Sequence, residues 1–143
     1  MKVVINVCYG GFSLSDEAID RYLELKGLKL YKKYDEQWKM TSYYYVPYEE
    51  YQKVHKNDLT KTEWEGKSEG IGRYKESNAL CWGGQRDIER NDPILIQVIE
   101  EMGSNAENRV AELKIVEIPD DVKYVIEEYD GWEWVAEEHR TWR

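Results

Sequence analysis

The chain has 143 residues and a formal net charge of −9, from 20 basic and 29 acidic residues. This length suits one domain with its own hydrophobic core, and the acidity argues against duplex nucleic acid as a partner, because phosphate binding needs a basic surface. The apolar run Val3–Ile5 is too short for a signal peptide or a membrane helix. We therefore expect a cytoplasmic protein that does not bind membranes.

The first elements are a buried strand and a capped helix. β-branched residues dominate Lys2–Cys8 and predict a strand, which Gly10-Gly11 ends. Ser13 or Ser15 can cap the helix that follows, and Gly27 suits its end. The opening of the chain therefore predicts a β-α unit.

The middle of the chain is less regular. Residues 28–34 and 38–46 have the composition of strands, and Pro47 favours a short helix over 48–55. Residues 56–79 are polar and contain three glycines. They predict a long loop or a mobile hairpin.

The last third predicts one helix and up to three strands. Asp92 can cap a helix that begins at Pro93 and ends at Gly103. Residues 110–118 and 122–129 read as strands, and 132–142 as a third strand or an extended tail. The expected fold is α+β, with mostly antiparallel strands and helices on one face, over one domain from 1 to 143.

The titratable residues predict no catalytic or metal site. Cys8 and Cys81 fit no zinc spacing and are expected to be free thiols. His55 and His139 have no metal-ligand partner at useful spacing. The paired glutamates point in different directions on a helix or strand and are expected to be solvated. A non-catalytic binding protein without a cofactor is the expectation.

Arginines gather in one segment. Four of the seven arginines fall within residues 73–109, where aromatic, amide and glycine residues surround them. Guanidinium groups bind phosphate, aromatic rings stack on bases, and a helix N-terminus such as that at Asp92-Pro93 offers amides to an anion. This composition suits a nucleotide site. The alternative is that these arginines pair with surface carboxylates.

Three segments resemble a family of small phage and prophage proteins. They are Cys8–Ala18 (CYGGFSLSDEA), the Arg90-Asn91-Asp92-Pro93 segment with its helix, and Leu113–Val122 continuing through Tyr129-Asp130-Gly131 to Trp142. The resemblance covers about 1–27 and 86–142, and 28–85 resembles a variable insertion. Within this family the chain resembles the Thoeris anti-defence proteins, which sequester cyclic ADP-ribose signals in infected bacteria.

The resemblance implies a non-catalytic sponge for a cyclic ADP-ribose isomer or a cyclic oligonucleotide, acting as a homo-oligomer. By position and chemistry, the expected ligand-binding residues are Arg90, Asn91, Arg109, Arg86, Trp82, Phe12 and Tyr74, with Arg21 and Arg73 as weaker candidates. Two other functions stay open. One is an acidic inhibitor that mimics nucleic acid, since 93–143 carry 13 acidic and five basic residues. The other is a small nucleotide-processing enzyme.

Overall fold

The computed structural model describes residues 1–65 and 75–139, without the side chains of 58–65 and 75. The fold is α+β with antiparallel strands, as the sequence predicts. The chain forms two compact units. Unit 1 contains residues 1–28 and 88–143, and unit 2 contains 29–87, close to the bounds of the 28–85 segment that resembles an insertion.

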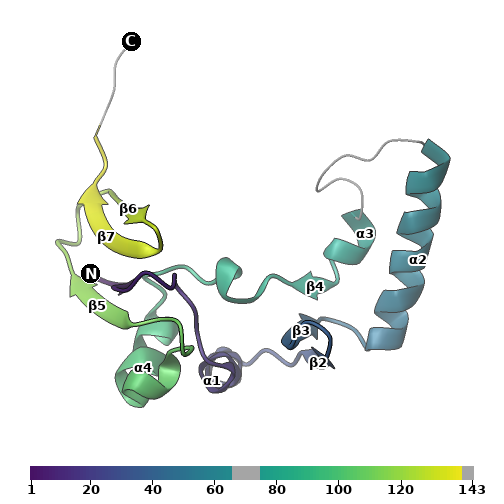
Figure 1. Ribbon diagram of the computed structural model, residues 1–143, viewed down its shortest axis with the longest axis horizontal. Coiled ribbons are helices and arrows are strands. Elements are labelled where there is room, and N and C mark those ends of the chain that lie inside the picture. Colours follow the sequence, from purple (N-terminus) through teal and green to yellow (C-terminus); the bar gives the residue numbers. More distant parts are fainter. Residues whose placement is uncertain (66–74, 140–143) are drawn as a thin grey trace, which may run out of the picture. The chain divides into compact units, whose positions relative to one another are not determined.

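Unit 1 is built on strand β1 (Lys2–Asn6), which pairs with β5 (Leu113–Glu117). Helices α1 (Asp16–Lys26) and α4 (Pro93–Met102) pack together on one side of this ladder, and the hairpin of β6 (Tyr124–Tyr129) and β7 (Trp132–Glu137) lies on the other (Figure 1). The core forms where α4 covers β1, and Val3, Val4, Leu95 and Val98 are fully buried.

Local signals set the helix ends of unit 1 as expected. The Ser15 hydroxyl accepts a hydrogen bond from the Ala18 amide, and Gly27 ends α1 in the left-handed region at φ 75°. Asp92 caps α4 by accepting from the Ile94 amide. A short 3-10 helix, η3 (Gly103–Ala106), follows α4 and leads toward β5.

Unit 2 contains a three-stranded sheet in the order β2 (Tyr31–Asp35), β3 (Met40–Tyr44) and β4 (Cys81–Trp82). Helix α2 runs from Tyr48 to Glu65, α3 covers Lys75–Asn78, and the 3-10 helix η2 covers Gly84–Asp87. The predicted loop over 56–79 is therefore wrong at 56–65 and 75–78, while 66–74 lie outside the described residues. The helix was missed because its second half has no apolar stripe.

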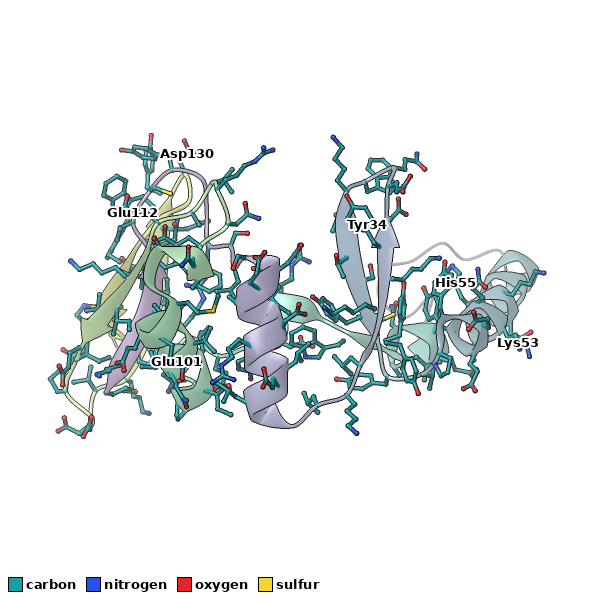
Figure 2. All side chains as sticks on the ribbon, turned by 90° about the horizontal axis from the view of Figure 1, so that it is seen from below. Tyr34, Lys53, His55, Glu101, Glu112 and Asp130 are labelled. Carbon is teal, nitrogen blue, oxygen red and sulfur yellow. The ribbon has the colours of Figure 1, made fainter. Side chains whose placement is uncertain are left out.

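Aromatic rings form the interior of unit 2. Tyr51 packs on Tyr44 with ring centroids 4.5 Å apart, and His55 stacks on Tyr51 at 5.5 Å. Burial, with smaller contributions from Cys81 and Tyr44, raises the pKa of the Tyr51 phenol to about 12. These tyrosines hold α2 against the sheet, and Figure 2 shows His55 on this helix.

Candidate functional site

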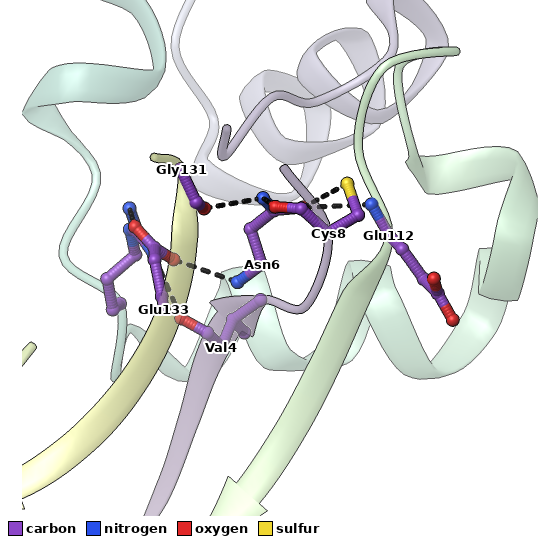
Figure 3. Close-up of polar contacts among 7 residues, drawn as sticks. Val4, Asn6, Cys8, Glu112, Gly131 and Glu133 are labelled. Carbon is purple, nitrogen blue, oxygen red and sulfur yellow. Dashed lines mark hydrogen bonds and ion pairs between the residues drawn. The ribbon is translucent and has the colours of Figure 1, made fainter. Parts of the chain in front are cut away.

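Asn6 ties three loops of unit 1 together (Figure 3). Its side chain is fully buried at the end of β1. Its amide nitrogen donates to the carbonyls of Cys8 and Gly131, both at 2.8 Å, and its amide oxygen accepts from the Glu112 amide at 2.9 Å. One side chain therefore fixes the loop after β1, the segment before β5 and the β6–β7 turn.

Arg90 forms an ion pair on the inner side of these loops. Its guanidinium donates to both carboxylate oxygens of Glu133, at 2.7 and 2.9 Å, and to the Val4 carbonyl at 3.1 Å. The guanidinium carbon lies 3.5 Å from the centroid of the Phe12 ring. Glu133 is buried and a two-point ion pair has a fixed geometry, so the Arg90 guanidinium is held in place. The Phe12 ring packs on this guanidinium, and the contact holds the loop between β1 and α1.

Two glycines let the loops approach closely. A Cβ on Gly10 would lie 1.6 Å from the Val110 carbonyl oxygen, so only glycine fits against this backbone. Gly131 has φ 88°, and a Cβ there would lie 2.7 Å from the Gly11 nitrogen. We call the outer side of residues 9–13, 108–110 and 129–132 the three-loop surface.

Exposed aromatic rings occupy one part of the three-loop surface. Tyr9 is 63% exposed and Trp132 is 42% exposed, yet their rings meet edge to face with centroids 5.2 Å apart. Flat rings with polar tips suit contact with a base or with another protein. The sequence reasoning named neither residue as a site residue, although Tyr9 lies in the quoted CYGGFSLSDEA motif.

Arg109 belongs to the same surface. It is exposed in the turn before β5, where the neighbouring Asn108 amide donates to the Ser13 carbonyl at 3.2 Å. Two acidic residues, Asp130 and Glu112, lie at the same end of unit 1 (Figure 2). The surface therefore combines one exposed guanidinium with aromatic rings, glycines and local negative charge.

Asn91 lies elsewhere in unit 1. It lines an open pocket of about 380 Å³ together with Met1, Lys2, Pro93, Ile96, Gln97 and Glu100. The pocket wall is mostly apolar. Lys2, which also lines the pocket, pairs with Glu100, with Nζ 2.6 Å from Oε1. The predicted neighbours Arg90 and Asn91 thus face different surroundings, the first an ion pair and the second a pocket.

The remaining predicted residues lie in unit 2, on α1 of unit 1 or outside the described residues. Trp82 is buried against Tyr43, with ring centroids 5.4 Å apart, so its ring is part of the interior of unit 2. Arg86 is exposed on η2. Tyr74 and Arg73 fall among the residues that are not described. Arg21 lies on α1 and pairs with Glu101 at 3.1 Å.

Two backbone positions whose amides could receive an anion already hold carboxylates of the chain. The Gly83 amide donates to Asp87 Oδ2 at 2.8 Å. At the start of α4, the Ile94 amide donates to Asp92 Oδ1 at 2.8 Å, and the Tyr22 hydroxyl donates to Asp92 Oδ2 at 2.6 Å. A phosphate would have to displace these acids, so neither position is a preferred phosphate site.

The Asp92 pair also shifts two pKa values. Partial burial raises the pKa of Asp92, but the hydrogen bonds from Tyr22 and Ile94, with Lys26 nearby, outweigh burial and leave that pKa below its ordinary value. Burial and the bond to Asp92 raise the pKa of the Tyr22 phenol. The pair joins α1 to the start of α4.

His55 of unit 2 is held in a contact between two helices. His55 Nδ1 lies 3.3 Å from Ser77 Oγ, and Ser77 is fully buried, so this pair joins α2 to α3. Both cysteines are free thiols. Among residues 1–65 and 75–139, no group of three His, Cys, Asp or Glu side chains is arranged to hold a metal ion. Over the same residues, no helix is long and apolar enough to cross a membrane.

No family model, curated protein or solved structure matches this chain. The family resemblance therefore stays a prediction from the motifs. The chemistry of the three-loop surface has to be argued from its own residues, which are Tyr9, Arg109 and Trp132 on the outside and Asn6, Phe12 and Arg90 behind them.

Proposed function

We propose that this protein binds a cyclic nucleotide-derived signal, of the cyclic ADP-ribose or cyclic oligonucleotide class, and sequesters it without cleaving it. In this proposal it acts as a phage anti-defence protein inside an infected bacterium. The observation that carries the proposal is the exposed Arg109 guanidinium on the surface that also presents the Tyr9–Trp132 ring pair. The resemblance of the CYGGFSLSDEA segment supports the same ligand class.

Arg109 is the proposed phosphate contact. Its side chain is exposed, whereas the guanidinium of Arg90 is bound by Glu133 on two sides. A guanidinium binds phosphate through two parallel hydrogen bonds, which suits a pyrophosphate. In an acidic protein, one well-placed arginine also selects where an anionic ligand can bind.

The Tyr9–Trp132 pair is the proposed base contact. Stacking of a base on an aromatic side chain contributes about 1–3 kcal/mol, and it needs an exposed ring face. Phe12, Arg90 and Asn6 have a positioning role in this proposal, because they fix the loops that carry Tyr9 and Trp132. Preformed loops lower the entropy cost of binding.

The decisive experiment identifies the ligand that the protein retains and releases on denaturation. The protein is incubated with individual cyclic ADP-ribose isomers and cyclic dinucleotides, separated from free ligand and denatured by heat, and the released ligand is identified by mass spectrometry. We expect at least one ligand to be retained and recovered unaltered. Recovery of a changed ligand would show an enzyme. Retention of none, together with capture of a basic protein, would favour the acidic inhibitor.

Substitutions test whether the ligand binds to the three-loop surface. We expect Arg109→Ala to weaken binding about tenfold or more, since a hydrogen bond to a charged group contributes about 1.5–3 kcal/mol. The matched control is Arg21→Ala, which removes an arginine that is paired on α1. Asn91→Ala should leave affinity unchanged, because Asn91 lines a pocket outside the three-loop surface. Equal affinity in Arg109→Ala and the unmodified protein would remove Arg109 from the site.

A further inference from the structure

One face of the β6–β7 hairpin is apolar and points away from the core of unit 1. The register pairs Tyr129 with Trp132, Glu127 with Trp134 and Val125 with Ala136, which places these six side chains on one face. Trp134 is 42% exposed and Tyr129 is 72% exposed. The opposite face carries the buried Glu133, so the register cannot slip to hide the aromatic residues.

Acidic residues outnumber basic ones around the rings of this outward face. By the same register Glu127 and Glu138 lie on this face, opposite Trp134 and Lys123, and Asp130 lies in the turn. The Glu127 carboxylate also accepts a hydrogen bond from Trp134 Nε1 at 2.9 Å. Two copies of this face would bring like charges together, which opposes a symmetric contact. The face therefore suits a partner that is basic and aromatic.

The β2–β3 hairpin of unit 2 has that complementary chemistry. Residues 29–40 contain four lysines against two acidic residues, in a chain of net charge −9. Trp38 and Met40 are exposed near its turn, with Lys39 between them, and Tyr34 is exposed on β2 (Figure 2). β2 is also an edge strand of its sheet, since within residues 1–65 and 75–139 only β3 pairs with it.

We propose that the outward face of the β6–β7 hairpin binds the β2–β3 hairpin of a second copy of this chain. The contact joins different surfaces of the two copies, so it is head-to-tail rather than symmetric. Lysines meet the carboxylates around the face, and Trp38 packs against the exposed rings of the other copy. The outward face shares Tyr129 and Trp132 with the three-loop surface, so the test substitutes neither of them and leaves Arg109 unchanged.

The prediction is salt-dependent self-association of the full chain. Light scattering coupled to gel filtration should show an average mass above that of one chain, increasing with protein concentration. The association should weaken when salt is raised from about 0.1 to 1 M, where the screening length falls from roughly 10 to 3 Å. A chain that stays monomeric at every concentration would overturn the proposal. A chain that stays monomeric but binds a lysine-rich peptide would also overturn the proposal, because the face would then bind a different basic protein.

Two variants separate the two sides of the contact. The face variant combines Trp134→Thr with Glu127→Lys, and the hairpin variant combines Trp38→Ser with Lys39→Asp, where aspartate tolerates the φ of 50°. Each should weaken self-association about tenfold or more, as loss of a central tryptophan does in protein interfaces. The matched charge controls are Glu49→Lys and Lys53→Glu on α2, which change exposed residues outside both surfaces. These controls should leave self-association unchanged. Circular dichroism checks that every variant is folded.

Mixing the two variants gives the sharpest test. The hairpin variant keeps an intact acidic face, and the face variant keeps an intact basic hairpin. A head-to-tail contact predicts that neither variant associates alone, whereas the mixture forms a 1:1 complex of two chains. Failure of the mixture to associate, or oligomers of either variant equal to those of the unmodified chain, would overturn the proposal.

Discussion

Arg90 and Glu133 join the segment before α4 to strand β7 by a two-point ion pair, with N···O distances of 2.7 and 2.9 Å. The carboxylate also accepts a hydrogen bond from the backbone N–H of Asn6 at 2.8 Å. A side chain expected to face a ligand thus holds three segments of unit 1 together. The pair is buried on its carboxylate side, with the Glu133 side chain 8% exposed.

Neutralising Glu133 is expected to destabilise the fold strongly. Glu133→Gln leaves the partly buried Arg90 cation without its counter-charge, so the free energy of unfolding should fall by about 3 kcal/mol. Urea denaturation followed by circular dichroism measures the change. The control is Glu100→Gln, which breaks the half-exposed pair with Lys2 and should change stability little. Equal losses in both variants would show that the Arg90–Glu133 pair has no special role.

Removing the Asn6 side chain should loosen all three loops together. Asn6→Ala leaves the Cys8 and Gly131 carbonyls and the Glu112 amide without their partner. A buried group without its partner costs about 1–3 kcal/mol, and because these three groups are only partly buried we expect a loss of about 2 kcal/mol in total. Hydrogen exchange should rise in residues 8–13, 110–112 and 129–132, while Asn108→Ala, at an exposed position, leaves exchange in all three segments unchanged. Faster exchange in one loop alone would contradict the common anchor.

Gly10 is predicted to be the least replaceable glycine of unit 1. The Cβ of Gly10→Ala would collide with the Val110 carbonyl, and both partners are backbone, so the loops must move apart. We expect a loss of roughly 3 kcal/mol or more. Gly84→Ala is the control, because its φ of 71° brings strain of about 1 kcal/mol but its Cβ meets open space. Thermal unfolding of both variants gives the comparison, and a smaller loss at Gly10 than at Gly84 would be inconsistent with close loop packing.

Asp92 should make stability depend on acid pH. Its pKa is lowered in the folded protein, so the folded state binds fewer protons than the unfolded state. This contribution to the free energy of unfolding is present above the ordinary aspartate pKa of about 3.9 and is lost as pH falls through the lower folded value. Asp92→Asn keeps a capping side chain and should flatten the profile. Denaturation at a series of pH values between about 2 and 6 checks this, and superimposable profiles would refute it.

Asp130 is expected to weaken the binding of an anionic ligand to the three-loop surface. Its backbone has φ 51°, which asparagine also adopts readily, so Asp130→Asn removes one negative charge without altering the turn. Affinity for a bound cyclic nucleotide should rise a few-fold at low salt, and the gain should shrink as salt screens the charge. Calorimetric titration at two salt concentrations measures both effects. Unaltered affinity at low salt would place the ligand away from this turn.

Elements whose signals are local could be predicted from the sequence. The Ser15 and Asp92 caps, the left-handed Gly27 and the strand over residues 2–6 follow from propensity and capping chemistry, which act within one turn or one strand. The second half of α2 escaped prediction because polar residues 56–65 carry no periodic apolar pattern.

Among the described residues, only tertiary contacts show which candidate site residues are bound by the chain itself and which are exposed. Composition placed Arg90, Asn91 and Arg109 in one arginine-rich stretch, but 43 residues separate Arg90 from the glutamate that binds it. Trp82 packs inside unit 2, while Trp132, outside the stretch, is exposed beside Tyr9. Ion pairs and ring contacts form between segments that are distant in the sequence. Their partners therefore depend on which segments the fold brings together. Residue type therefore indicated the kind of chemistry, and only the fold decided which groups are bound and which are exposed.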